Sequence, residues 1–297
     1  MTLGGRAPEP LRIGQAWFAW GDRTFLMGIL NLTPDSFSGD GLVVGGSDSS
    51  GRDMAVDRAI RMVAEGADIL DIGGESTRPG HVPVSVNEEL ARVIPVLRAI
   101  RHALPDVPLS VDTRTIAVAA AALDAGADLL NDVTGVTGDG SLARIAGERG
   151  VPYVLMHDRR LEADAPGTIA GRVVADLVVA VDRAVALGCP RAAIIVDPGI
   201  GFGKTPEQNL ELLRDLELLQ DLGRPVLLGA SRKSTIGRVL ELPAADRLEG
   251  TLATTALGIA NGADLVRVHD VLANRRVARM SDAIVRGWHP TDQETHP

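Results

Sequence analysis

The sequence predicts a (β/α)8 TIM barrel, an α/β fold of eight parallel strands alternating with helices, preceded by an N-terminal β-hairpin. Two observations predict it. Eight short apolar runs are separated by helical patterns, and each run ends in a group of polar residues. This pattern is typical of buried parallel strands that have functional residues at their C-terminal ends. We therefore divide the 297 residues into an N-terminal extension with the hairpin (1–24), one barrel domain (25–288) and a polar tail (289–297).

The elements are expected in the following order. A hairpin spans residues 11–30, turns at Gly21-Asp22 and continues into the first barrel strand. The barrel strands are expected at residues 26–31, 69–72, 109–112, 129–131, 153–156, 194–197, 226–229 and 265–269. The helices are expected at residues 52–65, 87–102, 116–125, 142–147, 170–187, 207–222, 248–261 and 272–286.

A Gly-Ala-Asp triplet recurs where a helix leads into a strand. It stands at residues 66–68, 126–128 and 262–264, each time before an apolar pair. We expect the glycine to end the helix in the left-handed conformation. Because these joints lie at the N-terminal ends of the strands, the repeat indicates a role in folding rather than in catalysis.

Two segments on the catalytic side are long and rich in turn-forming residues. Residues 39–51 are rich in Gly, Ser and Asp, and residues 78–86 contain two prolines. Their place at the mouth favours a mobile lid, whereas two long surface loops are the simpler alternative.

Composition narrows the class of protein. The net charge of −9 argues against a nucleic-acid partner, which requires a basic face. We find no apolar stretch long enough to span a membrane and no signal-peptide core. The single cysteine, Cys189, excludes an intrachain disulfide. We therefore expect a cytoplasmic enzyme.

Two carboxylates and one amide follow three of the predicted strands. Asp112, Asn131 and Asp197 would present hydrogen-bond acceptors to a ring with several N–H donors, such as an aminopyrimidinone. Acid–base catalysis by the carboxylate pair is the competing interpretation. A zinc site is disfavoured because a histidine cluster is missing. Met156 and Phe202 would sandwich a flat heterocycle, although core packing explains them nearly as well.

Cationic side chains near the mouth suit an anionic ligand. Arg267 and His269 alternate on the last strand and so point the same way, as a phosphate or diphosphate site requires, with an Arg267–Asp270 ion pair as the structural alternative. No nucleophile elbow is present. We interpret Ser231 as a hydrogen-bonding residue and Lys233 as a cation over the ligand, with a Schiff-base lysine as an alternative. The lone His157 is interpreted as structural.

These motifs resemble those of the dihydropteroate synthases, folate-pathway enzymes of the pterin-binding barrel family. The resemblance extends from about Phe25 to Trp288, nearly the whole chain. Its motifs occupy residues 28–38, 73–80, 110–113, 131–133, 156–157, 197–204, 229–233 and 267–270. Each motif alone is modest support, but all of them in this order are highly specific.

The resemblance implies a transferase that joins 7,8-dihydropterin-6-ylmethyl diphosphate to 4-aminobenzoate, releasing diphosphate and forming 7,8-dihydropteroate. It implies Mg²⁺ as cofactor, with Asn31 as its ligand, and a homodimer. The residues it assigns to catalysis are Asn31, Lys233, Arg267 and His269. Those it assigns to the pterin diphosphate are Thr77, Asp112, Asn131, Met156, Asp197, Phe202, Gly229, Lys233, Arg267 and His269. Those it assigns to 4-aminobenzoate are Phe37, Thr77, Arg78, Pro79, Phe202 and Ser231.

Two other functions remain open at this point. One is a methyltransferase acting on methyltetrahydrofolate, in which we would not expect residues 76–79 and 231–233 together. The other is a non-catalytic pterin-binding paralogue, which loss of Thr77, Arg78, Lys233 or the Arg267/His269 pair would favour. None of these residues is missing.

Overall fold

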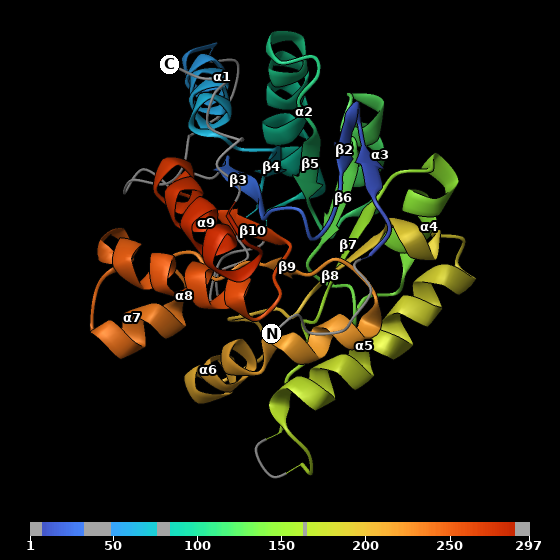
Figure 1. Cartoon of the computed structure of the whole chain (residues 1–297). Helices are drawn as coiled ribbons and strands as arrows, with labels where there is room; N and C mark the ends of the chain where they lie inside the picture. Colours follow the sequence, from blue (N-terminus) through green and yellow to red (C-terminus); the bar gives the residue numbers. More distant parts are fainter. Residues whose placement is uncertain (1–7, 33–48, 76–83, 163–164, 289–297) are drawn as a thin grey trace.

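Eight parallel strands surrounded by helices form the centre of a computed structural model that describes residues 8–32, 49–75, 84–162 and 165–288 (Figure 1). The strands follow the order β8-β7-β6-β5-β4-β3-β10-β9. A bridge between Val196 and Val226 joins the two ends of this order and closes the barrel. The (β/α)8 prediction is therefore confirmed. The bounds of the strands are β3 Phe25–Asn31, β4 Ile69–Gly73, β5 Leu109–Asp112, β6 Leu129–Asp132, β7 Tyr153–Met156, β8 Ile194–Asp197, β9 Leu227–Leu228 and β10 Leu265–Val268.

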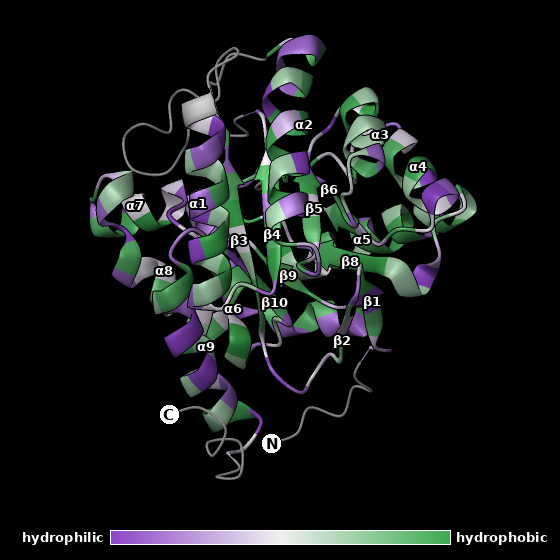
Figure 2. Cartoon of the chain, turned by 90° about the horizontal axis from the view of Figure 1, so that it is seen from above, coloured by the Kyte–Doolittle hydropathy of each residue, from purple (hydrophilic) through white to green (hydrophobic). Residues whose placement is uncertain are grey.

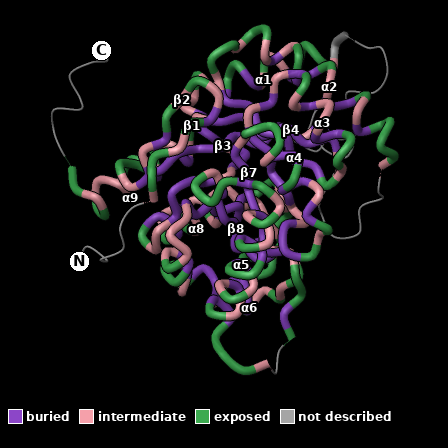
Figure 3. Tube along the Cα trace, turned by 90° about the vertical axis from the view of Figure 1, so that its right-hand side faces the viewer, coloured by how far each residue is buried: buried purple, intermediate pink, exposed green. Residues whose placement is uncertain are grey.

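The helices pack around the barrel with their apolar sides inward, so that buried residues gather at the centre and exposed residues on the outer helix faces (Figures 2 and 3). Their bounds are α1 Ser49–Glu65, α2 Val86–Ala103, α3 Ile116–Asp124, α4 Ser141–Arg149, α5 Ile169–Ala186, α6 Pro206–Arg214, α7 Ser234–Leu240, α8 Leu248–Ala260 and α9 Val271–Val285. Short 3₁₀ helices occupy Arg191–Ala193, Leu216–Leu222 and Ala244–Asp246. Within the described residues, no helix combines the length and the apolar character that crossing a membrane requires.

One helix prediction was wrong in detail, and one helix was missed. The single helix expected at residues 207–222 is α6 followed by a 3₁₀ helix. Leu213, Leu216 and Leu219 are all buried, and their spacing of three residues suits a 3₁₀ helix, in which positions i and i+3 lie above one another. Helix α7 was not predicted, because it is short and contains Gly237. A Cβ at Gly237 would lie 2.1 Å from the guanidinium of Arg247, so this glycine permits a close approach.

The N-terminal hairpin is present, but its predicted turn was wrong. Strands β1 (Leu11–Ile13) and β2 (Ala16–Phe18) pair antiparallel and turn at Gly14-Gln15, not at Gly21-Asp22. Gly14 has φ +58°, the left-handed conformation that two-residue hairpin loops favour at such a position. The second arm ends at Phe18, so β3 is a separate strand.

The hairpin closes the N-terminal end of the barrel. Ile13, Phe18 and Trp20 form one apolar cluster with the innermost side chains of the strands, among them Met27 and Ile195. The Phe18 and Phe25 rings lie 4.7 Å apart between centroids. With this end filled by apolar side chains, the inward residues at the other end of the strands are left to form the site.

The three Gly-Ala-Asp joints have the conformation that the sequence predicts. Their glycines have φ +106°, +107° and +95° at residues 66, 126 and 262. Each aspartate accepts a hydrogen bond from the backbone N–H of a neighbouring strand segment: Asp68 from Leu26 at 2.8 Å, Asp128 from Leu109 at 3.0 Å and Asp264 from Val226 at 3.0 Å. These joints therefore connect adjacent strands at the closed end.

Candidate functional site

The mouth of the barrel holds a cluster of buried polar side chains from four strands. Arg267 in β10 donates from Nε to Asp71 Oδ2 at 2.6 Å and from Nη2 to Asp112 Oδ2 at 2.7 Å. Asn131 in β6 donates from Nδ2 to the same oxygen of Asp71 at 3.0 Å. The other oxygen of Asp71 is buried and has no hydrogen-bond partner among the described residues. The cluster thus carries more acceptor atoms than its own donors satisfy.

Burial shifts the protonation equilibria of this cluster. It raises the pKa of Asp112 to about 7, with Arg267 opposing the rise and Asp71 adding to it. Burial also raises the pKa of Asp197, against the effect of Lys233. For Lys233, burial lowers the pKa to about 8, although Asp197 opposes the change. Burial alone would lower the pKa of Arg267, but Asp71 and Asp112 raise it above its ordinary value. Such shifts are typical of functional sites.

Asp197, at the end of β8, and Lys233, in the loop after β9, lie close together at the mouth. Asp197 Oδ1 accepts a hydrogen bond from the backbone N–H of Gly199 at 2.7 Å. Lys233 Nζ donates to the backbone carbonyl of Ile200 and lies 4.5 Å from the centroid of the Phe202 ring. The turn after β8 therefore supplies an aromatic face and a carbonyl that fix this lysine.

Met156 and Gly229 lie beside the same polar residues. Met156 is buried and lies beside Asp197 in the parallel register of β7 and β8. A Cβ at Gly229 would lie 3.7 Å from Asp197 Oδ2, 3.8 Å from Lys233 Nζ and 3.9 Å from Arg267 Cβ. Gly229 thus faces the polar cluster. The structure brings together all the pterin-site residues of the sequence prediction that lie within its described part, apart from the neighbouring His269.

His269 is held by Ser231 beside this cluster. Ser231 Oγ and His269 Nδ1 lie 2.9 Å apart, and His269 N donates to Ser231 Oγ at 3.2 Å. The alternative pairing of Arg267 with Asp270 does not form. Arg232 instead forms a bidentate ion pair with Asp270, in which its Nε and Nη2 donate to the two carboxylate oxygens at 3.0 and 2.7 Å. Arg232 has φ +56°, an unusual value for a non-glycine residue that is enriched at functional sites.

Asn31, at the end of β3, is the proposed metal ligand. It is half-buried and lies opposite Gly73 in the register of β3 and β4. Its side chain makes no hydrogen bond within the described residues, so its amide oxygen is available. In that part of the chain, no group of three or more His, Cys, Asp or Glu side chains could hold a metal ion. One neutral oxygen ligand fits Mg²⁺, which keeps most of its shell as water and substrate phosphate.

Some predicted residues lie outside the described part of the chain. These are Phe37, Thr77, Arg78 and Pro79, and with them most of residues 39–51 and 78–86 and the tail from residue 289. Of the predicted 4-aminobenzoate contacts, the structure describes Phe202 and Ser231.

Two participants in the cluster were not assigned from the sequence. Asp71 belongs to one of the polar groups that end a strand, and it lies two residues after Ile69, which packs in the interior of the barrel, so both side chains point inward. Lys204 lies in the sequence motif at residues 197–204, but no role was assigned to it. Its Nζ lies 2.9 Å from Nδ1 of His157, whose Nε2 lies 3.0 Å from Asp176 Oδ2. The structural interpretation of His157 fits this buried arrangement.

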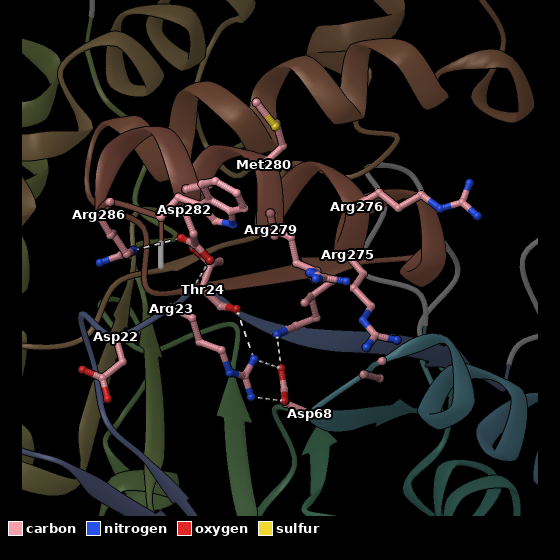
Figure 4. A pocket seen from close by; sticks show the side chains of 17 residues that line it. Asp22, Arg23, Thr24, Asp68, Arg275, Arg276, Arg279, Met280, Asp282 and Arg286 are labelled. Carbon is pink, nitrogen blue, oxygen red and sulfur yellow. Dashed lines mark hydrogen bonds and ion pairs between the residues drawn. The ribbon is translucent and has the colours of Figure 1, made fainter. Parts of the chain in front are cut away.

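A hollow of about 710 Å³ lies away from the mouth, between the start of β3 and the second half of α9 (Figure 4). Four of its charged side chains form two ion pairs. Arg23 contacts Asp68 at 2.6 Å, and Arg286 contacts Asp282 at 2.9 Å. We assign this hollow to the structural base of the barrel.

The chain matches the family of pterin binding enzymes over residues 27–269. It is 47% identical to a dihydropteroate synthase of Clostridium beijerinckii, covering 93% of this chain and 100% of the relative. It is 49% identical to that of Bacillus subtilis, covering 89% and 90%. The chain belongs to the dihydropteroate synthase family. It is thereby a transferase of folate synthesis.

Solved structures of this family have the same fold. The dihydropteroate synthase of Clostridium difficile, determined in the presence of pteroic acid, matches with a TM-score of 0.84 and 47% identity, covering 91% of this chain and 99% of that one. The Xanthomonas albilineans dihydropteroate synthase with 4-aminobenzoic acid matches with a TM-score of 0.82 and 39% identity, covering 94% and 98%. Family membership therefore extends over nearly the whole chain and the whole barrel.

Proposed function

We propose that this chain joins 7,8-dihydropterin-6-ylmethyl diphosphate to 4-aminobenzoate and releases 7,8-dihydropteroate and diphosphate. The observation that carries the proposal is the buried set of acceptors Asp112, Asn131 and Asp197 at the mouth, with the Lys233 ammonium near both aspartates and 4.5 Å from the centroid of the Phe202 ring. A flat ring with several N–H donors and a carbonyl group satisfies such a set. A dihydropteroate synthase of Xanthomonas albilineans, 37% identical, has been solved in complex with 7,8-dihydropteroate.

The carboxylates recognise the pterin rather than transfer protons. Asp112 Oδ2 already accepts from Arg267, which leaves Oδ1 for a ring N–H. Asp197 Oδ1 accepts from the Gly199 backbone, which leaves Oδ2 facing the opening at Gly229. Asn131, whose side-chain amide acts neither as an acid nor as a base, completes the set. Met156, Phe202 and Gly229 then border the ring faces.

The diphosphate end of the substrate is bound by Arg267 and His269, and by Mg²⁺ held through Asn31. Arg267 uses Nε and Nη2 for its two aspartates, so Nη1 remains to donate to a phosphate oxygen. His269 is held by Ser231 through Nδ1, which directs Nε2 away from that partner. Mg²⁺ held through Asn31 would neutralise charge on the leaving diphosphate.

The reaction needs no protein nucleophile. The C–O bond to diphosphate breaks with its electron pair leaving on oxygen, and the electron-rich pterin stabilises the cation that remains. The lone pair of the 4-aminobenzoate amine forms the new C–N bond, and the amine then loses one proton. This amine is neutral near pH 7, so no strong general base is required. The residues at the mouth contribute by stabilising the leaving charge.

The 4-aminobenzoate site is proposed to contain Phe37, Thr77, Arg78, Pro79, Phe202 and Ser231. If their segments complete the pocket only around bound pterin, 4-aminobenzoate alone binds poorly, because ordering them costs conformational entropy. We expect its affinity to rise when pterin and Mg-diphosphate are added. Calorimetric titration of 4-aminobenzoate with and without these ligands tests this, and equal affinities would mean a preformed pocket.

We also propose a cytoplasmic homodimer. Leu257 of α8 and Met280 and Ile284 of α9 are large apolar side chains that are 64%, 63% and 72% exposed. Helices α8 and α9 pack side by side, so these residues offer an apolar surface for a second copy. Light scattering of the purified chain measures the mass, and a monomer at micromolar concentration would contradict the dimer.

The decisive experiment is an assay of diphosphate release. With both substrates and Mg²⁺ we expect diphosphate and 7,8-dihydropteroate in equal amounts. Omitting 4-aminobenzoate should abolish product. Pterin binding without turnover would indicate a non-catalytic paralogue. Methyl transfer from methyltetrahydrofolate, measured in parallel, would indicate the methyltransferase.

A further inference from the structure

The chain uses lysine at only two positions, and both lie at the mouth of the barrel. Of its 30 Lys and Arg side chains, Lys204 and Lys233 are the only lysines. An ammonium is a compact charge with three donors, whereas a guanidinium is a planar fork. The two lysines are therefore compact cations in a chain that otherwise uses arginine. Lys233 already has a proposed role toward the pterin, whereas Lys204 has none.

The Lys204 ammonium lies among acceptors from two loops. Nζ is 3.0 Å from the carbonyl oxygen of His157, 3.1 Å from that of Gly199 and 3.1 Å from that of Phe202. The surroundings are tight, because a Cβ at Gly199 would lie 1.9 Å from the carbonyl oxygen of His157. Three converging carbonyls, together with His157 Nδ1 at 2.9 Å, give the three ammonium protons four acceptors to share and leave little room for a guanidinium.

The ring of His157 continues this contact to helix α5. Its Nδ1 lies 2.9 Å from Lys204 Nζ, and its Nε2 lies 3.0 Å from Asp176 Oδ2. Burial, followed by the charge of Lys204, lowers the pKa of His157 to about 4. The neutral ring therefore donates from Nε2 to Asp176 and accepts at Nδ1 from Lys204, a tautomer assigned from the hydrogen-bond network. Arg159 donates to the other oxygen of Asp176 at 2.7 Å.

The turn that Lys204 holds supplies contacts of the pterin site. Its Ile200 carbonyl accepts a hydrogen bond from Lys233, and its Phe202 ring lies 4.5 Å from Lys233 Nζ. Its Gly199 N–H donates to Asp197 at 2.7 Å. We propose that Lys204 is a positioning residue whose ammonium fixes the turn of residues 199–204 and thereby sets Phe202, Lys233 and Asp197 for the pterin.

The inference rests on the proposed function. The following experiment distinguishes a failure of the inference from a failure of the proposed function. Pterin binding is first measured calorimetrically on the wild-type chain, and failure there would contradict the proposed function. Lys204→Met is then compared with Thr205→Ala. Thr205 is a matched control because it caps α6 through a capping box with Gln208, and its hydrogen bonds among the described residues go to Gln208 and Asn209 and not to the three carbonyls.

We expect Lys204→Met to weaken pterin binding by about 10- to 100-fold and Lys204→Arg not to restore it. Thr205→Ala should lower the melting temperature by a few degrees, about what loss of a cap causes, without changing pterin affinity. A folded Lys204→Met variant that binds pterin as tightly as the wild type would overturn the proposal.

A measurement on the wild-type chain covers the case in which Lys204→Met does not fold. Nitrogen-15 labelling of lysine gives two side-chain signals, which Lys233→Arg assigns. Burial lowers the pKa of Lys204 to about 7, so the spectra are recorded at pH 6, where the ammonium form is present. We expect the Lys204 ammonium protons to exchange slowly with water, and more slowly with pterin bound. Exchange as fast as that of a free lysine would contradict the proposal.

Discussion

The two ends of the barrel use aspartate in opposite ways. At the closed end, the aspartates of the three Gly-Ala-Asp joints each accept a backbone N–H of a neighbouring strand segment. At the mouth, Asp71 and Asp112 share the guanidinium of Arg267, and one oxygen of Asp71 has no partner among the described residues.

The difference lies in what surrounds each carboxylate. A backbone N–H is fixed by the fold, and Arg23 and Arg101 also donate to Asp68 and Asp128, so the closed-end aspartates are bound within the protein. Asp71 and Asp112 instead share one guanidinium, and Asp71 keeps an oxygen without a partner among the described residues, which leaves acceptor capacity for a ligand. Burial raises the pKa of Asp112 to about 7, whereas Asp264 at the closed end reaches about 6 despite its backbone hydrogen bond. Burial thus raises the pKa of an aspartate at both ends of the barrel, and the two ends differ instead in the hydrogen-bond partners of their aspartates.

The largest expected effect comes from removing a cation at the mouth. Arg267→Ala should weaken binding of the pterin diphosphate by about 100- to 1000-fold, because two buried carboxylates lose their partner and the diphosphate loses a donor. His269→Ala should weaken it by about 10- to 100-fold and leave free pterin nearly unaffected. Calorimetry with both ligands measures this difference. Since Arg267 also contacts Asp112, His269→Ala is the cleaner variant, and equal weakening of both ligands by it would contradict the diphosphate assignment.

Exchanging an acceptor at the mouth should have the next largest effect. Asp112→Asn places N–H donors where the pterin also presents them, so we expect pterin affinity to fall by about 30- to 100-fold. Thermal unfolding should change little, because the variant removes a costly buried charge. If pterin bound normally while turnover collapsed, Asp112 would be a proton-transfer residue instead.

The pH dependence of pterin binding should follow Asp112. Its pKa in the unliganded chain is raised to about 7, and a ring N–H binds the carboxylate form. Below pH 7 a growing fraction must lose a proton before binding, so affinity should fall by up to about tenfold per pH unit. Titrations from pH 5.5 to 8 in Asp112→Asn should lack this slope. A wild-type affinity independent of pH in that range would exclude the role of the carboxylate form.

The smallest effect is expected at the closed end. Asp128→Ala removes the acceptor of the Leu109 N–H and the ion-pair partner of Arg101. We expect it to lower the free energy of unfolding by about 1–3 kcal/mol without changing pterin affinity at temperatures where the variant is folded. Denaturant unfolding and calorimetry on one preparation measure both, and a lower pterin affinity in the folded variant would erase the distinction between the two ends.

The features that could be predicted from the sequence are those that depend on the periodicity of apolar residues and on position along the chain. The strands of the barrel, the left-handed glycines at residues 66, 126 and 262 and the residues of the polar cluster follow from alternation and from the polar groups that end each strand. The hairpin turn was misplaced because Gly14 and Gly21 offer similar turn signals, and only the pairing of Leu11 with Phe18 decides between them.

Side-chain partners could not be predicted in the same way. An Arg267–Asp270 ion pair was the structural alternative from the sequence, but whether Asp71, Asp112 or Asp270 accepts from Arg267 depends on the packed interior. Likewise, the contact of Lys204 with His157 joins residues 47 positions apart. Such partnerships are set by the three-dimensional arrangement of strand ends, which local pattern does not encode.

The seam between the first and last strands joins the two ends of the chain. Strand β3 pairs with β10, and Thr24 donates to Asp282 through its backbone N–H and its hydroxyl, each at 2.8 Å and across 258 residues. During synthesis the first strand therefore leaves the ribosome long before its last neighbour exists. The edge of β3 that pairs with β10, and the apolar side chains of the hairpin, remain without their partner until β10 has been synthesised. Closure of the barrel therefore comes at the end of translation.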